Sequence, residues 1–167
     1  DKALTKATND FSKAGYPMDA EAMMIIELDG TDSEVSELIS TVEVIAEKNK
    51  CSSVKISKSD AERSKFWAGR KAAFPACAEL APDYMCMDGS IPRGKLSEVL
   101  KEIQKLSDKY DLPVANAFHA GDGNLHPLIM FNANDPEQLK KTEEFGAEIL
   151  KYCVKVGGAL TGEHGVG

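Results

Sequence analysis

The sequence contains no uninterrupted apolar run that approaches the roughly 20 residues needed for a membrane-spanning helix. Its start shows no signal-peptide pattern, in which a basic stretch precedes an apolar one. Acidic residues outnumber basic residues by 27 to 20, and the formal net charge of −7 argues against nucleic acid or an anionic membrane as the main partner. These absences predict a cytoplasmic protein with no transmembrane segment.

Cysteine is also scarce, and its four copies are scattered along the chain at Cys51, Cys77, Cys86 and Cys153. No two of them form a C-x-x-C pair, the spacing typical of many zinc and redox sites. We therefore predict four reduced thiols, as is usual in a cytoplasmic protein.

The remaining composition is that of a globular protein. Hydrophobic residues make up 43% and charged residues 28% of the 167 positions, which is enough to build a buried core. We see no internal repeat, low-complexity tract or linker rich in proline and serine. The sequence therefore predicts one domain across residues 1–167.

The order of apolar patterns is mixed. A polar, helix-permissive stretch that ends at a stop signal predicts a helix over residues 2–14. Helical patterns with capping and stop signals predict helices over residues 32–49, 60–74, 96–106 and 136–156. Short apolar runs predict strands over residues 23–28, 54–56, 84–91, 114–118 and 125–131. Thr31 and Glu34 are spaced as a capping box, and Pro75 predicts a helix stop. Two strand–helix–strand units predict an α+β sandwich of ferredoxin-like type, with an antiparallel sheet and helices packed on one face.

All three histidines lie near the end of the sequence, within two glycine-rich segments. The first segment, residues 119–126, reads HAGDGNLH, and the second, residues 162–167, reads GEHGVG. Histidine titrates near neutrality and is the commonest metal ligand. The two segments therefore indicate a chemical site.

His119 and His126 are seven positions apart, so their side chains would point to opposite faces of one straight strand. The intervening Gly-Asp-Gly-Asn permits a tight reversal that brings both imidazoles to one point. Glu163 is the natural third ligand, and a His₂Glu set suits zinc or a similar divalent ion. The alternatives are surface or structural histidines and a flexible glycine-rich end.

At these residues the sequence resembles the C-terminal domain of FAD-linked 2-hydroxyacid oxidases and dehydrogenases, whose flavin domain is of the vanillyl-alcohol-oxidase type. Residues 66–71 (FWAGRK), 84–92 (YMCMDGSIP) and 114–118 (VANAF) agree with the same family. The resemblance covers essentially the whole chain, and it points to members that oxidise glycolate or D-lactate. It implies FAD as the cofactor.

The resemblance also implies a role for each candidate residue. His119, His126 and Glu163 match positions that hold a divalent metal, commonly zinc, in metal-dependent members. His164 matches the base that takes the substrate hydroxyl proton while hydride leaves for the flavin, and Arg70 matches the arginine that grips the substrate carboxylate. The residues alone favour a helix-surface ion pair for Arg70, and they leave His164 as a further ligand or a loop histidine.

This sequence differs from the family pattern in two respects, and each difference limits what the resemblance implies. Relatives that act on dicarboxylates carry a lysine near the position of Cys86 and an asparagine at the position of Leu128, so a small monocarboxylate is expected here. Flavin in this family is held mainly by an N-terminal domain, and no glycine-rich phosphate loop is found in this sequence. We therefore expect a fragment that is inactive alone.

The expected partners are a small 2-hydroxy acid, the protein's own FAD-binding domain, and other oxidase subunits including an iron–sulfur subunit. Two other classes of function remain open from the residues. One is a stand-alone ferredoxin-like binding or regulatory module without redox activity. The other is a zinc hydrolase, although the sequence lacks the H-E-x-x-H arrangement.

Overall fold

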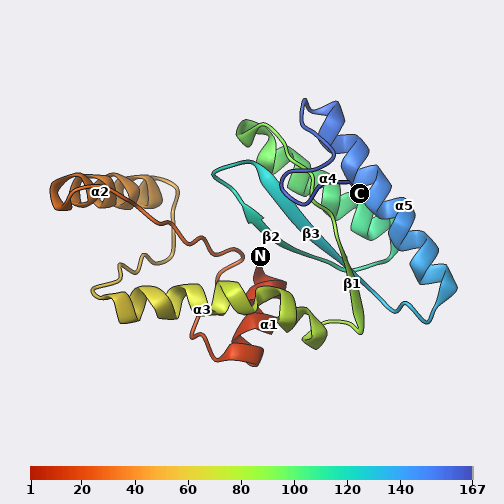
Figure 1. Ribbon diagram of the computed structural model, residues 1–167, viewed down its shortest axis with the longest axis horizontal. Helices are drawn as coiled ribbons and strands as arrows, with labels where there is room; N and C mark the ends of the chain where they lie inside the picture. The colour runs from red at the N-terminus through yellow and green to blue at the C-terminus, as the bar shows by residue number, and fades with distance from the viewer. Residues whose placement is uncertain (167) are drawn as a thin grey trace.

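The computed structural model describes residues 1–166 and combines helices with one small sheet (Figure 1). The helices are α1 (Lys2–Ser12), α2 (Asp32–Lys48), α3 (Asp60–Ala76), α4 (Leu96–Tyr110) and α5 (Pro136–Lys155), with short 3-10 turns at Cys77–Glu79 and Arg93–Lys95. The strands are β1 (Asp83–Cys86), β2 (Val114–His119) and β3 (Asn124–Phe131). The predicted α+β class is confirmed.

The three strands form one antiparallel sheet in the order β1-β3-β2. Because β3 runs antiparallel to both neighbours, β1 and β2 are parallel and are joined by the crossover helix α4. This split β-α-β arrangement, followed by β3 and α5, is the ferredoxin-like pattern. Every residue of the central strand β3 is buried, which makes it the structural centre of the domain.

One face of the sheet is covered by α4 and α5, as predicted. Alternate residues of β3 point to this face and meet apolar stripes of the two helices, which also pack on each other. The buried residues of this core are Ile91, Val99, Ile103, Leu106, Leu112, Leu125, Ile129, Phe131, Phe145, Ile149 and Cys153. Each fully buried Ile, Leu or Phe side chain contributes roughly 1.5–3 kcal/mol to folding.

The opposite face carries a second helical layer, α1 and α3, that the sequence pattern did not predict. Its core consists of Leu4, Ala73, Cys77, Ala115, Ala117, Leu128 and Met130. Most of these side chains are small, so α1 and α3 bring only a weak apolar stripe to the interface. The close approach that small residues permit is visible at Gly69, where an added Cβ would overlap the ring of Tyr16.

Two predicted strands, residues 23–28 and 54–56, are wrong. Both segments lack strand pairing and flank α2, so that residues 21–59 form an extension that we call the α2 arm (Figure 1). Met24 and Ile26 are 67% and 50% exposed, and α2 contributes no buried residue. An apolar run becomes a strand only where a neighbouring strand can satisfy its backbone, and neither segment has such a neighbour among residues 1–166.

Other boundaries differ more modestly. Helix α3 continues past Pro75 to Ala76 before a 3-10 turn, whereas Pro75 was predicted to stop it. Strand β1 ends at Cys86 rather than near residue 91, because Pro127 on β3 has a carbonyl but no N–H for the ladder. The chain nevertheless stays beside β3, since Met87 N donates to Pro127 O at 3.0 Å.

The caps behave as the sequence predicts. Thr31 N donates to Glu34 Oε2 at 2.8 Å at the start of α2, and Asp135 caps α5 ahead of Pro136. Within residues 1–166 no helix has both the length and the apolarity that a bilayer crossing requires.

Candidate metal and substrate site

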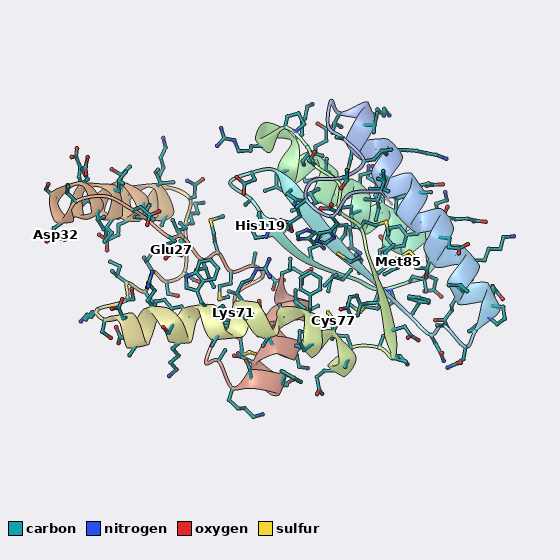
Figure 2. The ribbon with its side chains drawn as sticks, in the orientation of Figure 1. Glu27, Asp32, Lys71, Cys77, Met85 and His119 are labelled. Atoms are coloured by element: carbon teal, nitrogen blue, oxygen red, sulfur yellow. The ribbon has the colours of Figure 1, made fainter. Side chains whose placement is uncertain are left out.

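The β2–β3 hairpin brings His119 and His126 to the same face of the sheet. The chain reverses between the two strands, and Gly123 takes a positive φ of 73° within the reversal. The two imidazole rings lie 5.6 Å apart, centre to centre, and are nearly perpendicular. The predicted reversal is therefore present, and it places both histidines toward α3, the side on which Figure 2 shows His119.

The second glycine-rich segment reaches these histidines by running beside residues 88–90, which follow β1. After α5 the chain turns at Gly157 and Gly158, and Ala159 forms an antiparallel bridge with Ser90. Figure 1 shows this end of the chain folded back over the sheet. Segments that are distant in sequence thus meet at one end of the sheet.

Glu163 lies at the centre of the resulting cluster. Its Oε1 is 3.0 Å from His126 Nε2, 3.5 Å from His164 Nε2 and 3.9 Å from His119 Nε2. The rings of His126 and His164 are stacked at 5.1 Å. The structure therefore brings together the four clustered residues that the sequence singled out.

Asp88 is a fifth member of the cluster, and sequence reasoning missed it. Its Oδ1 lies 3.4 Å from His126 Nε2, and its ligand atom falls within 4.8 Å of those of His126, Glu163 and His164. Strand parity offered a usable signal, because Asp88 follows Cys86 by two positions and so points to the same face. An acidic residue on the buried face of a strand requires a partner.

The other carboxylate oxygen of Asp88 accepts four hydrogen bonds from the second glycine-rich segment. The donors to Oδ2 are Thr161 Oγ1 at 2.7 Å, Gly162 N at 3.1 Å, Glu163 N at 3.0 Å and His164 N at 2.7 Å. Burial alone would raise the pKa of Asp88, but these hydrogen bonds outweigh burial and hold the pKa far below its usual range. Asp88 is therefore a buried carboxylate anion.

His126 is the most enclosed histidine, with 2% of its side chain exposed. Burial lowers the pKa of His126, and the carboxylates of Glu163 and Asp88 only partly oppose that shift. A neutral imidazole is the form that binds metals. Phe74 of α3 packs against its ring at 6.1 Å, which closes the site on the helix side.

Unpartnered atoms provide a test of whether the cluster suits a cation. His126 Nε2 and Asp88 Oδ1 are both buried and make no hydrogen bond within residues 1–166, because the close approach of Glu163 Oε1 to His126 is not aligned for one. A divalent cation between imidazole nitrogens and carboxylate oxygens would satisfy such atoms. The residues therefore fit a metal. The side chains of His119, Glu163 and His164 are about half exposed, so one side of the cluster is open to a ligand.

Arg70 lies on α3, one helical turn before Phe74 and so on the same side of the helix. It is half-buried, and its guanidinium forms no ion pair with a carboxylate of residues 1–166. The helix-surface ion pair that the sequence left open for Arg70 is thus not formed within this part of the chain.

The four cysteines are free thiols in the structure, and Cys77 and Cys153 are fully buried. Cys86 is half-buried, and it faces Leu128 across the sheet, on the face that carries the cluster. Burial raises the pKa of Cys86 to about 11, with Asp88 adding to the shift. The Cys86 side chain is therefore an uncharged thiol.

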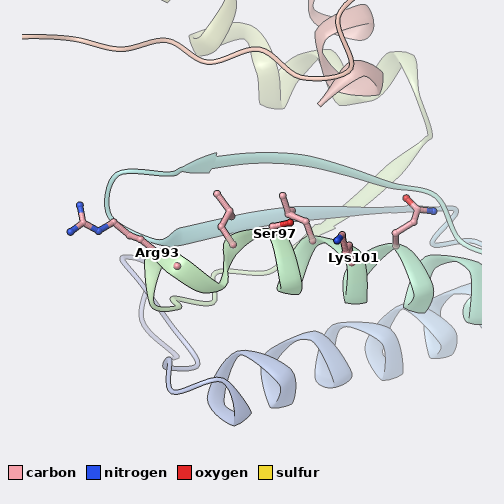
Figure 3. A pocket seen from close by; sticks show the side chains of 7 residues that line it. Arg93, Ser97 and Lys101 are labelled. Atoms are coloured by element: carbon pink, nitrogen blue, oxygen red, sulfur yellow. The ribbon is translucent and has the colours of Figure 1, made fainter. Parts of the chain in front are cut away.

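A separate shallow groove runs along the outer face of α4, where Arg93, Ser97 and Lys101 line it (Figure 3). It contains none of the cluster residues, and its lining side chains belong to a single helix and the turn before it. The groove therefore adds nothing to the candidate site.

Fold and site together define a ferredoxin-like α+β domain that carries a histidine–carboxylate cluster at one end of its sheet. Comparison with protein families gives a match over residues 1–167 to the family described as FAD linked oxidases, C-terminal domain. The chain belongs to this family. The predicted family is thereby confirmed.

Individual relatives agree with the family. The chain is 53% identical over its whole length to the glycolate oxidase subunit GlcD of Escherichia coli, and 32% identical over its whole length to that of Bacillus subtilis. It is 32% identical over 86% of its length to the mitochondrial D-lactate dehydrogenase [cytochrome] of Arabidopsis thaliana. The chain covers 34%, 36% and 26% of these relatives respectively.

Proposed function

We propose that this chain is the substrate-binding C-terminal domain of a flavin-dependent 2-hydroxyacid dehydrogenase that oxidises glycolate to glyoxylate, or D-lactate to pyruvate. The observation that carries the proposal is the convergence of His119, His126, Glu163 and His164 on one face of the sheet, in a chain that matches the oxidase family throughout. The similarity to two glycolate oxidase subunits favours glycolate.

The oxidation removes one proton and one hydride from the 2-hydroxy acid and leaves a 2-oxo acid. When bound, FAD supplies the hydride acceptor, and a divalent ion such as zinc supplies Lewis acidity near the substrate hydroxyl. His119, His126 and Glu163 would hold the ion. His164, beside Glu163 and half exposed, takes the hydroxyl proton, as a general base does in such a step.

Arg70 is assigned to the substrate carboxylate. A guanidinium offers two parallel N–H donors that match the two carboxylate oxygens, which fixes the orientation of the substrate as well as binding it. Because no carboxylate of residues 1–166 forms an ion pair with Arg70, its donors are free of an internal competitor.

The apolar side chains of Cys86 and Leu128 are evidence that the substrate is small. The two residues are cross-strand partners in the β1–β3 register, and both lie on the face that carries the cluster. A second carboxylate on the substrate would find no cation or amide at either position. This pair therefore supports a monocarboxylate such as glycolate or lactate over a dicarboxylate.

Steady-state turnover of glycolate and D-lactate by the full-length flavin-loaded polypeptide tests the proposal. We expect turnover with a 2-hydroxy acid, and a kcat loss on the order of 10²–10⁴-fold in His164→Ala, because a positioned general base contributes about that factor. Asp122→Ala is the matched control, since its exposed side chain lies in the hairpin loop outside the cluster. Wild-type kcat in His164→Ala would refute the role assigned to that histidine.

A further inference from the structure

The segment that carries Glu163 and His164 has little of its own to hold it in place. Residues 161–166 form no helix or strand, and all but Thr161 are exposed, including Val166 at 74%. Gly165 N bonds only to Thr161 Oγ1 within the same segment. Burial of apolar surface therefore contributes little to fixing the segment on the sheet.

Asp88 supplies the missing attachment. Four donors from the segment converge on its Oδ2, and Gly162 N also lies 2.7 Å from the Asp88 backbone carbonyl. An ionised carboxylate suits this task because it only accepts hydrogen bonds, and charge-assisted bonds are about twice as strong as neutral ones. Three consecutive backbone N–H groups around one oxygen fix the direction in which the intervening side chains leave the chain.

The two oxygens of Asp88 face different parts of the cluster. While Oδ2 holds the segment, Oδ1 is buried, has no hydrogen-bond partner within residues 1–166, and lies 3.4 Å from His126 Nε2. Negative charge at this point favours a cation beside His126 and disfavours an anion. The Asp88 side chain thus connects His126, which lies on strand β3, to the segment that carries Glu163.

We propose that Asp88 is a positioning residue of this site, which places Glu163 and His164 through Oδ2 and directs negative charge at the metal position through Oδ1. The proposal rests on the function proposed above. It assigns a role to a residue that the substrate itself need not touch.

Two substitutions separate the two roles in the full-length polypeptide. Asp88→Ala removes both oxygens, so amide hydrogen exchange in peptides spanning residues 161–165 should become at least tenfold faster, and zinc affinity should fall by about 10–100-fold, as for other groups that orient metal ligands. Asp88→Asn keeps one oxygen to accept from the segment but presents an uncharged amide to His126. We expect exchange with Asp88→Asn to be slower than with Asp88→Ala but faster than in the wild type, because the remaining oxygen is uncharged and accepts more weakly, together with a loss of zinc affinity in the same range.

Asp83→Ala is the matched control, because Asp83 lies at the other end of β1 and its carboxylate accepts a single backbone bond, from Ala133 N at 2.8 Å. It should leave both measurements unchanged. Wild-type exchange of residues 161–165 in Asp88→Ala would overturn the proposal. If Asp88→Ala does not fold, Asp88→Asn decides, and wild-type zinc affinity in that variant would overturn the proposal.

The exchange measurement also separates this proposal from the proposed function. A wild-type protein that binds no zinc would contradict the proposed metal site. Faster exchange in Asp88→Ala would still support the attachment of the segment by Asp88, because exchange of these amides needs neither metal nor turnover.

Discussion

At the scale of single residues, burial and hydrogen bonding together set the protonation state of the groups in and around the site. His126 is nearly inaccessible, and burial keeps its imidazole neutral although two carboxylates lie within 3.4 Å of its Nε2. Asp88 is also buried but remains ionised, because four donors compensate for the loss of water. Burial thus leaves one group neutral and the other charged, because four donors stabilise the Asp88 anion, whereas neither ring nitrogen of His126 makes a hydrogen bond within residues 1–166 that would stabilise an imidazolium.

The thiols give a prediction that depends on pH. Burial raises the pKa of Cys77 and of Cys153 from 9.0 to about 11, so both remain thiols in the folded protein at pH values where an unfolded chain begins to ionise. With iodoacetamide at pH 8 we expect the exposed Cys51 to be alkylated first, and the two buried residues only after unfolding.

The same shifts set the sign of the pH dependence of stability. A raised pKa in the folded state stabilises the fold fully below pH 9, and this contribution is lost as the pH rises from about 9 to 11. Mass spectrometry of alkylated peptides and urea denaturation across this pH range measure the two effects. Equal alkylation of Cys51 and Cys153 in the folded protein would contradict the assignment of burial as the cause.

The residues of the candidate site were predictable to different degrees. His119 and His126 could be placed together because the glycines between them permit a reversal of the chain. Glu163 and His164 were singled out because they lie together in the second glycine-rich segment. Asp88 was missed because three of the four hydrogen bonds that it accepts come from backbone N–H groups, which any sequence possesses. The family resemblance, rather than spacing, singled out Arg70, since a lone arginine on a helix has no local signature.

At the scale of elements, the β2–β3 hairpin depends on one glycine more than on its neighbour. Gly123 has a positive φ and lies so close to the carbonyl of Ile91 that an added Cβ would overlap it, whereas Gly121 has open space around it. Gly123→Ala should therefore cost about 2 kcal/mol or more of unfolding free energy and displace His119 relative to His126.

Gly121→Ala, two residues away in the same loop, should change the unfolding free energy by less than about 0.5 kcal/mol. Urea denaturation of both variants makes the comparison, and equal stabilities would contradict the importance given to Gly123. The pair separates the effect of backbone conformation from that of merely adding a methyl group to the loop.

Helices were the most predictable elements and isolated strands the least. Helices α4 and α5 carry regular apolar stripes, and α5 is also capped by Asp135, so their positions followed from the sequence. The layer formed by α1 and α3 was not predicted, because its contacts rely on alanine and glycine rather than on large apolar side chains. The apolar runs at residues 23–28 and 54–56 were misread as strands, since hydrophobicity alone does not provide a neighbouring strand.

At the scale of the whole molecule, the α2 arm is held less firmly than the rest. Its links to the body include exposed ion pairs, Lys2 with Glu21 at 2.6 Å and Arg63 with Glu27 at 2.7 Å, and such pairs typically contribute at most about 1 kcal/mol. By contrast, α4 and α5 pack on each other and on β3. Local opening of the arm should therefore require little free energy.

Limited trypsin digestion of the 167-residue chain tests this difference. We expect the first cuts after Lys48, Lys50 or Lys55, which lie in the arm. Lys105 is a matched control, because its side chain is 73% exposed but stands on the packed helix α4. Early cleavage after Lys105 would show that side-chain exposure, rather than local stability, controls the digestion.

The bonds between Asp88 and residues 161–164 also bear on the order of folding. They join positions that are 73 to 76 residues apart, whereas the two histidine-bearing strands are neighbours along the chain. Contacts of such long sequence separation carry a larger loop-closure cost and form after local ones. A folding chain therefore acquires its hairpin before its complete cluster, and the site becomes whole only when α5 has docked and its trailing segment reaches Asp88.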